Sequence, residues 1–132
     1  MAEEESNSEL EEFHTIVNRA GDSLPKPAGW RMLIAVPKAR EQTEGGIFKP
    51  GQAIRDEELG TIIGLVIQVG PLAFKDSKKF GSNGPWAHRG DYIMMRSYTG
   101  TRFMVGDQEF RLINDESVEA IVDNPGGITK VL

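Results

Sequence analysis

Apolar and polar side chains alternate along most of the chain, with the period of two that is typical of half-buried β-strands. In residues 30–36, Met32, Ile34 and Val36 share one face, and Pro37 ends the strand. Residues 61–70 are almost continuously aliphatic, which predicts a central strand, and Gly64 favours a bulge or a bend there. Further strands are predicted at residues 92–96, 101–105, 109–113 and 117–122, with a hairpin turn at Gly106-Asp107. This series of strands without crossover helices predicts an all-β fold, and the small size favours a compact barrel.

Near the N-terminus the period changes to that of a helix. Ser8 and Glu11 form a capping box, and Gly21 ends the pattern. The apolar face consists of Leu10, Phe13, Ile16 and Val17. We expect a short amphipathic helix outside the barrel, with residues 1–7 disordered. Its apolar stripe either docks on its own domain or binds a partner or a neighbouring subunit.

Two long connections interrupt the strand pattern. Residues 41–60 contain four glycines and Pro50, so a regular helix or strand is excluded through most of this loop. Within it, the apolar pair Ile47-Phe48 favours a tethered docking arm. Residues 70–90 interleave three aromatic with three basic side chains: Phe74, Phe80 and Trp86 with Lys75, Lys78 and Lys79. They form either a loop folded back on the barrel or, less favoured, a nucleic-acid stacking platform.

Charge separates the chain of 132 residues into an acidic start and a nearly neutral body. Residues 1–24 hold seven acids and one base, whereas the whole chain has a net charge of −5, so the remainder sums to +1. A one-sided basic surface is missing, which argues against a nucleic-acid partner. The sequence has no long apolar run and an acidic start, so neither a membrane span nor a signal peptide is predicted, and we expect a cytoplasmic protein.

The residue types that enzymes use for catalysis do not occur in this sequence at the spacings that a catalytic or metal site requires. The chain has no cysteine, and His14 and His88 have no ligand spacing, so no metal site and no cofactor is predicted. The adjacent carboxylates Glu57-Glu58 and Asp115-Glu116 fit solvated turns. Ser97 and Ser117 have no base nearby in the pattern, so we expect a binding protein and not an enzyme.

Several stretches in order resemble the GroES-like co-chaperonins, the small lid subunits of the chaperonin machine. They are residues 27–36, 43–47, 64–70, 90–93, 98–101, 106–110 and 115–122, including Thr43-Glu44-Gly45-Gly46-Ile47 and Gly90-Asp91-Tyr92-Ile93. Gly84-Pro85-Trp86 and residues 111–115 are most similar to the bacteriophage-encoded versions. The resemblance covers about residues 26–123. The expected organisation is an N-terminal extension at 1–24, a GroES-like β-barrel at 25–123 and a tail at 124–132.

The resemblance implies a heptameric ring that caps a large chaperonin of GroEL type and assists ATP-dependent folding of a client protein inside the chamber, with ATP bound by the partner. Residues 41–60 correspond to the mobile loop, and its docking residues would be Gly45, Gly46, Ile47, Phe48 and Lys49. Lys49 departs from the aliphatic residue that is usual in the family. Residues 70–90 correspond to a roof hairpin. The ring contact would join the first and last strands of neighbours, through Met32, Ile34, Val36, Val118, Ala120 and Val122.

Two functions remain open at this point. The first is a co-chaperonin, for which the resemblance to bacteriophage-encoded versions suggests a phage capsid protein as the client. The second is a structural protein of a virion or other assembly, with the loop as an arm that clasps a neighbouring subunit.

Overall fold

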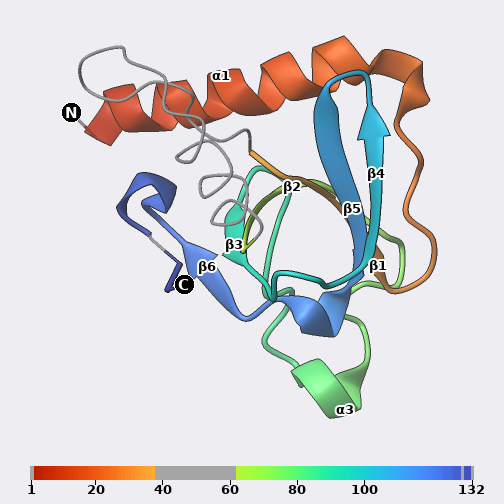
Figure 1. Cartoon of the computed structure of the whole chain (residues 1–132). Coiled ribbons are helices and arrows are strands. Elements are labelled where there is room, and N and C mark those ends of the chain that lie inside the picture. Colours follow the sequence, from red (N-terminus) through yellow and green to blue (C-terminus); the bar gives the residue numbers. More distant parts are fainter. Residues whose placement is uncertain (1, 38–61, 129, 132) are drawn as a thin grey trace.

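The computed structural model describes residues 2–37, 62–128 and 130–131 (Figure 1). Six antiparallel strands form one sheet in the order β4-β5-β1-β2-β3-β6. Their bounds are β1 (Arg31–Ala35), β2 (Ile63–Val69), β3 (Tyr92–Met94), β4 (Thr101–Val105), β5 (Gln108–Asn114) and β6 (Ala120–Val122). The sheet curls into an open barrel whose edge strands are β4 and β6. The predicted all-β barrel is therefore confirmed.

The helical elements lie outside this sheet. They are α1 (Ala2–Ala20), α3 (Ser77–Phe80) and three short 3-10 turns, η1 (Gly21–Ser23), η2 (Asp115–Ser117) and η3 (Pro125–Gly127). None of the described helices has the length and the apolar character that crossing a membrane requires.

The central strands bury both of their faces. On the inner face, the interior cluster of the barrel is made by residues such as Met32, Ile34, Val66, Met95 and Ile113. On the outer face, a second cluster contains Leu33, Ala35, Leu65, Ile67 and Phe110. This outer face would be an exposed apolar surface without a cover, and α1 supplies that cover.

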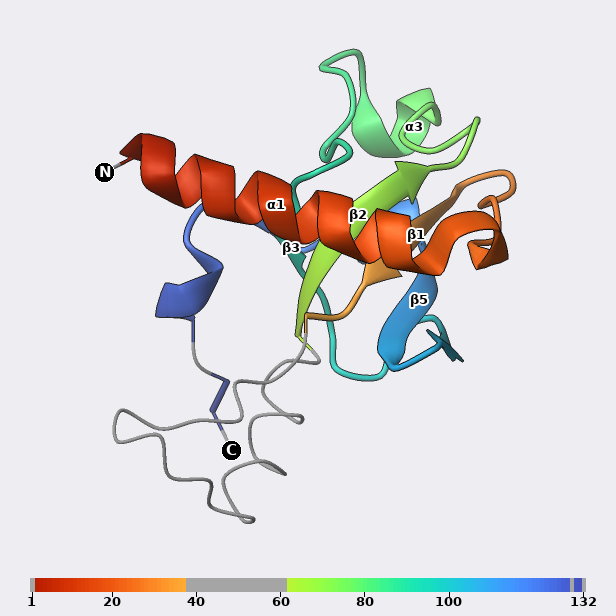
Figure 2. The ribbon, with the colours of Figure 1, turned by 90° about the horizontal axis from the view of Figure 1, so that it is seen from above.

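Helix α1 lies across the outer face of the sheet (Figures 1 and 2). Phe13, Ile16 and Ala20 are buried in the outer cluster, which agrees with docking of the helix on its own domain. Two polar contacts accompany the apolar ones: the Tyr92 hydroxyl donates to the Glu12 carboxylate, and the Arg89 guanidinium lies 5.6 Å from the centre of the Phe13 ring.

The helix is longer than the sequence pattern predicts. It begins at Ala2 and not at Ser8, so the expectation of a disordered start at residues 1–7 is wrong for residues 2–7. Residues 2–7 contain neither proline nor glycine, so the sequence has no residue there that stops a helix.

Gly64 serves the packing of the interior and not a bulge. It pairs with Ile93 in regular register, and the irregularity in the β1–β2 ladder lies between Leu33 and Ile34, opposite Ile67. A Cβ atom at position 64 would overlap the Cγ2 methyl of Ile34 and press on Met95. Only glycine allows these side chains to fill the barrel at this point.

The connection at residues 70–90 is a folded-back segment that joins the antiparallel neighbours β2 and β3, and none of its residues belongs to a strand. It contains α3, whose N-terminus is capped by the Asp76 carboxylate, which accepts a hydrogen bond of 3.0 Å from Lys78 N. Phe74 and Phe80 are buried in the interior cluster, where they pack edge to face with centroids 5.2 Å apart. Two buried rings are not accessible to bases, so the stacking-platform alternative loses its main elements.

Candidate functional site

The predicted docking residues Gly45, Gly46, Ile47, Phe48 and Lys49 lie outside the described residues. The structure does describe the two chain ends between which residues 38–61 are inserted. These ends follow β1 and precede β2, which are hydrogen-bonded neighbours with Ala35 opposite Leu65. Adjacent strands lie about 4.8 Å apart, so the whole insertion leaves and returns at one narrow base on the barrel.

The outgoing end of this base is fixed by the β4–β5 hairpin. Val36 N donates a hydrogen bond of 3.0 Å to Glu109 O. The Gln108 side chain completes the clamp, because its Nε2 donates to Val36 O at 2.6 Å and to Glu109 O at 2.9 Å. On the returning side, Met95 N donates to Ile62 O at 2.9 Å. Both ends are therefore held by the barrel through backbone hydrogen bonds.

A partly buried ion cluster lies next to the base, in β5 and β4. Arg102 donates two hydrogen bonds to the Glu109 carboxylate, at 2.9 and 3.1 Å, and Arg111 Nε donates a third at 3.2 Å. Arg111 is completely buried, and its Nη1 donates to Ser97 O at 2.6 Å. Its Nη2 is buried without a hydrogen-bond partner in the described part of the chain.

Burial and ion pairing shift the pKa values of Glu109 and Arg111 in opposite directions. Burial alone would raise the pKa of Glu109, but the hydrogen bonds from Arg102 and Arg111 outweigh it and hold that pKa below its ordinary value. Burial lowers the pKa of the Arg111 guanidinium, and Glu109 offsets part of this effect. The cluster joins β4, β5 and the turn at Ser97 into one unit beside the base of the insertion.

The sequence pattern missed the burial of Arg111 and Asp115. Asp115 is 3% exposed, and its carboxylate accepts hydrogen bonds from Phe74 N at 2.9 Å and from Glu116 N at 2.7 Å. Asp115 thereby ties the 70–90 connection to the end of β5. The available signal for Arg111 was its position two residues before Ile113, which places both on the inner face of β5.

The base and the 70–90 connection lie at opposite ends of β2. This strand begins at Ile63, beside the base, and ends at Val69, where the connection starts (Figure 2). Seven residues of strand span about 20 Å. The two ends of the barrel therefore differ: the insertion starts and ends at one of them, and the α3 segment lies at the other.

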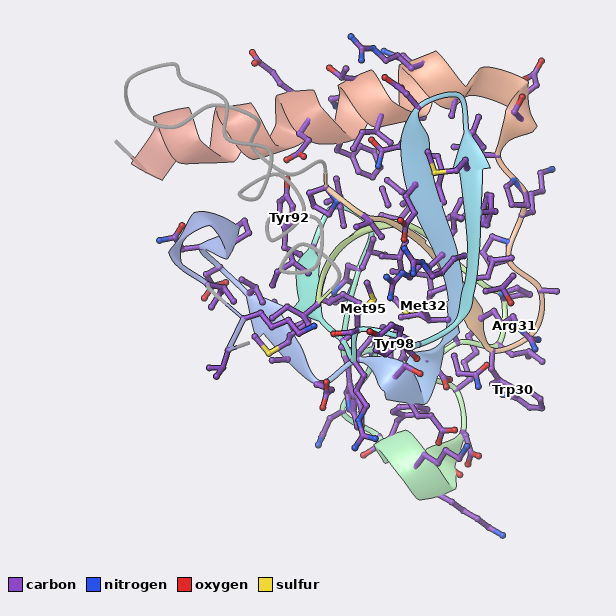
Figure 3. All side chains as sticks on the ribbon, viewed as in Figure 1. Trp30, Arg31, Met32, Tyr92, Met95 and Tyr98 are labelled. Atoms are coloured by element: carbon purple, nitrogen blue, oxygen red, sulfur yellow. The ribbon has the colours of Figure 1, made fainter. Side chains whose placement is uncertain are left out.

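The subunit contact through Met32, Ile34 and Val36 stays a prediction, and within the single chain these three side chains face the interior of the barrel. These side chains are 0%, 0% and 7% exposed and belong to the interior cluster of their own barrel; Met32 points inward in Figure 3. The backbone of β1 is also unavailable, since β2 and β5 pair with it on either side.

Of the three residues predicted at the other end of the chain, only Ala120 is exposed, because Val118 and Val122 are buried. Ala120 and Val122 belong to β6, which pairs on one side with β3 and is otherwise an edge of the sheet. A groove of about 370 Å³ lies here, lined by Trp86, Val118, Glu119, Ala120 and Ile121. Unlike β1, this end offers both a strand edge and an accessible apolar surface.

Within the described ranges, no three His, Cys, Asp or Glu side chains are grouped so that they could hold a metal ion. His14 and His88 are both exposed. His88 lies 3.7 Å from Asp91, with Nδ1 facing the Oδ2 carboxylate oxygen, and forms an ordinary surface pair.

A family model described as Chaperonin 10 Kd subunit matches residues 25–122. The match starts after α1 and η1 and ends with β6, so it includes all six strands, the 38–61 insertion and the 70–90 connection. The helix that covers the outer face of the sheet lies before the matched region.

Proposed function

The chain belongs to the chaperonin 10 Kd subunit family, and on this basis we propose that it is a co-chaperonin that closes a GroEL-type large chaperonin as a ring-shaped lid. Membership supports a co-chaperonin role and an oligomeric ring in general. The proposal adds that the ring is heptameric, that residues 41–60 dock on the large chaperonin and that the client folds in the chamber beneath the lid. ATP is bound by the large chaperonin, and this chain supplies no catalytic group.

The observation that carries the proposal is that the two ends of the barrel carry different segments. The insertion with its apolar pair Ile47-Phe48 is tethered at one end of β2, and the 70–90 connection closes the other end. A lid needs this separation, because one end must grip the chaperonin while the other covers the chamber. The rigid base at Val36 and Ile62 limits where the insertion can reach without itself taking part in docking.

Weak individual docking follows from the chemistry of the insertion. Burying one large apolar side chain yields about 1.5–3 kcal/mol. Ordering the backbone costs roughly 1–2 kcal/mol for each residue fixed, so a single loop binds weakly. Several loops on one ring raise the effective concentration of each after the first has docked, and the lid grips firmly while each contact stays reversible.

The test is capture by an ATP-bound large chaperonin. Replacing the apolar pair, as Ile47→Asp with Phe48→Asp, abolishes capture and leaves the ring assembled. Ile54→Asp is the matched control, because it places the same charge in the same insertion outside the docking residues and retains capture. Capture of the double variant at the wild-type level would refute the loop assignment.

Lys49 stands at a docking position where the family usually has an aliphatic residue, and we expect it to weaken docking on the large chaperonin. A cation in an apolar docking position must be desolvated, so Lys49→Leu raises the affinity for the large chaperonin. The similarity of Gly84-Pro85-Trp86 and residues 111–115 to bacteriophage-encoded versions supports a phage capsid protein as the client.

A further inference from the structure

Asn83 precedes Gly84 in the connection that follows α3, and both residues are exposed. Asparagine is chemically labile, because its side-chain amide carbon can be attacked by the backbone nitrogen of the next residue. A glycine in that next position favours the attack, since it has no Cβ atom that hinders the approach of its nitrogen. The residue pair therefore carries a reactive chemistry of its own, and the fold decides whether the backbone can use it.

The fold leaves the backbone around Asn83 unconstrained. α3 and the residues after it project from the barrel (Figures 1 and 2). Gly81 and Gly84 have φ of 65° and 82°, and apart from chain neighbours no atom lies within 4 Å of where a Cβ atom would stand on either of them. Within the part of the chain that the structure describes, Gly84 N donates no backbone hydrogen bond. The attacking nitrogen is thus exposed and not held by the fold.

The other asparagines lack this combination. Asn114 is exposed at the end of β5, but the following nitrogen, Asp115 N, donates a hydrogen bond of 3.1 Å to Trp30 O. The asparagines of α1 lie inside a helix, where the backbone ladder holds the following nitrogen in place. Asn124 precedes Pro125, whose nitrogen carries no hydrogen. These positions serve as internal controls for Asn83.

We propose that Asn83 is a site of spontaneous deamidation, a covalent modification for which this chain supplies both reacting groups. Gly84 N loses its proton to solvent base and bonds to Cγ of Asn83. The Cγ–Nδ2 bond breaks, ammonia leaves, and a cyclic succinimide remains. Water then opens the ring: cleavage between the nitrogen and Cγ gives an aspartate, and cleavage between the nitrogen and the backbone carbonyl carbon gives an isoaspartate. Either product adds a negative charge, and the reaction is independent of the proposed function.

The isoaspartate product has a structural consequence at Trp86. The indole packs edge to face on the buried Phe80 ring, with centroids 4.6 Å apart and an interplanar angle of 81°. In an isoaspartate the main chain runs through Cβ and Cγ, so the segment between Phe80 and Trp86 becomes longer by a backbone atom. Trp86 then moves on Phe80, and the groove beside β6, which Trp86 lines, changes shape. The aspartate product keeps the length of the main chain and leaves the ring pair in place.

Peptide mapping by mass spectrometry tests the modification in the full-length protein during incubation at mildly alkaline pH. The expected result is a progressive loss of the asparagine form at Asn83, faster than at acidic pH because base removes the Gly84 proton. Asn114 keeps its amide over the same period. Asn83→Gln is the matched variant, because it retains an amide but needs a larger ring, and it shows no conversion.

Tryptophan fluorescence tests the consequence in a Trp30→Phe background, where Trp86 is the remaining tryptophan. Ion exchange separates the products by charge, and peptide mapping identifies the fraction that contains isoaspartate. Its emission shifts to longer wavelength, whereas Asn83→Asp, which carries the charge without the added backbone atom, keeps the emission of the unmodified protein. Far-UV circular dichroism confirms that each form keeps its fold.

Two results overturn the inference. One is an asparagine form at Asn83 that persists in the protein while a synthetic peptide of residues 80–86 converts. The other is equal loss at Asn83 and Asn114, because the fold would then not select the site. Unchanged emission of the isoaspartate fraction overturns the consequence for Trp86.

Discussion

Helix α1 is an integral part of the domain, and truncation of Phe13 should demonstrate it. Phe13 is 9% exposed, and it packs in the outer cluster with strand residues such as Leu33 and Leu65. Phe13→Ala removes the buried ring and leaves a cavity. At core positions, replacing Phe by Ala lowers the free energy of unfolding by about 3–5 kcal/mol. Because a helix on a surface can settle into the space, we place the loss near the lower limit, at about 3 kcal/mol.

A second contribution comes from the face of the ring. The Arg89 guanidinium 5.6 Å from the Phe13 centroid adds about 0.5–1 kcal/mol at an exposed site. The expected total is a loss of about 3–4 kcal/mol in the free energy of unfolding. This is a large part of the stability of a domain of this size, so the variant should unfold at clearly lower denaturant.

Equilibrium urea unfolding followed by circular dichroism measures the effect. The matched control is Thr15→Ala, an exposed position on the same helix, which should change stability by no more than about 0.5 kcal/mol. A loss below about 1 kcal/mol for Phe13→Ala would refute the docking of α1 on the sheet. A fragment limited to residues 25–122 should aggregate, because the outer faces of β1 and β2 become exposed.

Two further predictions concern the barrel. Gly64→Ala should cost about 2 kcal/mol of stability, because its Cβ overlaps Ile34 Cγ2, and the cost should fall in an Ile34→Leu background, which lacks that methyl; equal costs in both backgrounds would contradict the packing argument. Glu109→Gln should destabilise by about 3 kcal/mol at pH 7, because Arg111 is left buried without its anion. Since the pKa of Glu109 is lowered from 4.5, its contribution is complete above that pH and is lost as pH falls below it. The stability difference between wild type and variant should therefore shrink at pH 3 in urea titrations, and a difference independent of pH would contradict the ion-pair assignment.

The positions of the strands along the chain could be predicted from the sequence because period-two patterns and turn residues are local signals. Residues 101–113 illustrate this: Gly106-Asp107 marks the hairpin, and Gly106 adopts a φ of 60°. The sequence pattern singles out Gly64 but does not show why glycine is needed there, because the overlap with Ile34 exists only once β1 and β2 are paired. The same applies to Arg111, whose hydrogen-bond partners are Glu109 and the Ser97 carbonyl in the connection between β3 and β4.

Predictions about the assembly depend on more than the sequence pattern of one chain. Met32, Ile34 and Val36 were assigned to a subunit contact through the family resemblance, but the barrel needs the same side chains for its own interior. The two exposed tryptophans gave no periodic signal, since Trp30 lies in a turn and Trp86 in an irregular connection.

The central claim is that this chain is a lid for a large chaperonin, and co-sedimentation of the two proteins tests it most directly. The full-length protein is mixed with a large chaperonin ring, with and without ATP, and the amount in the pellet is measured against concentration. The account predicts nucleotide-dependent binding that saturates at one ring of this chain for each chaperonin ring it closes. Absence of binding in every nucleotide state, while the chain itself forms rings, would contradict it.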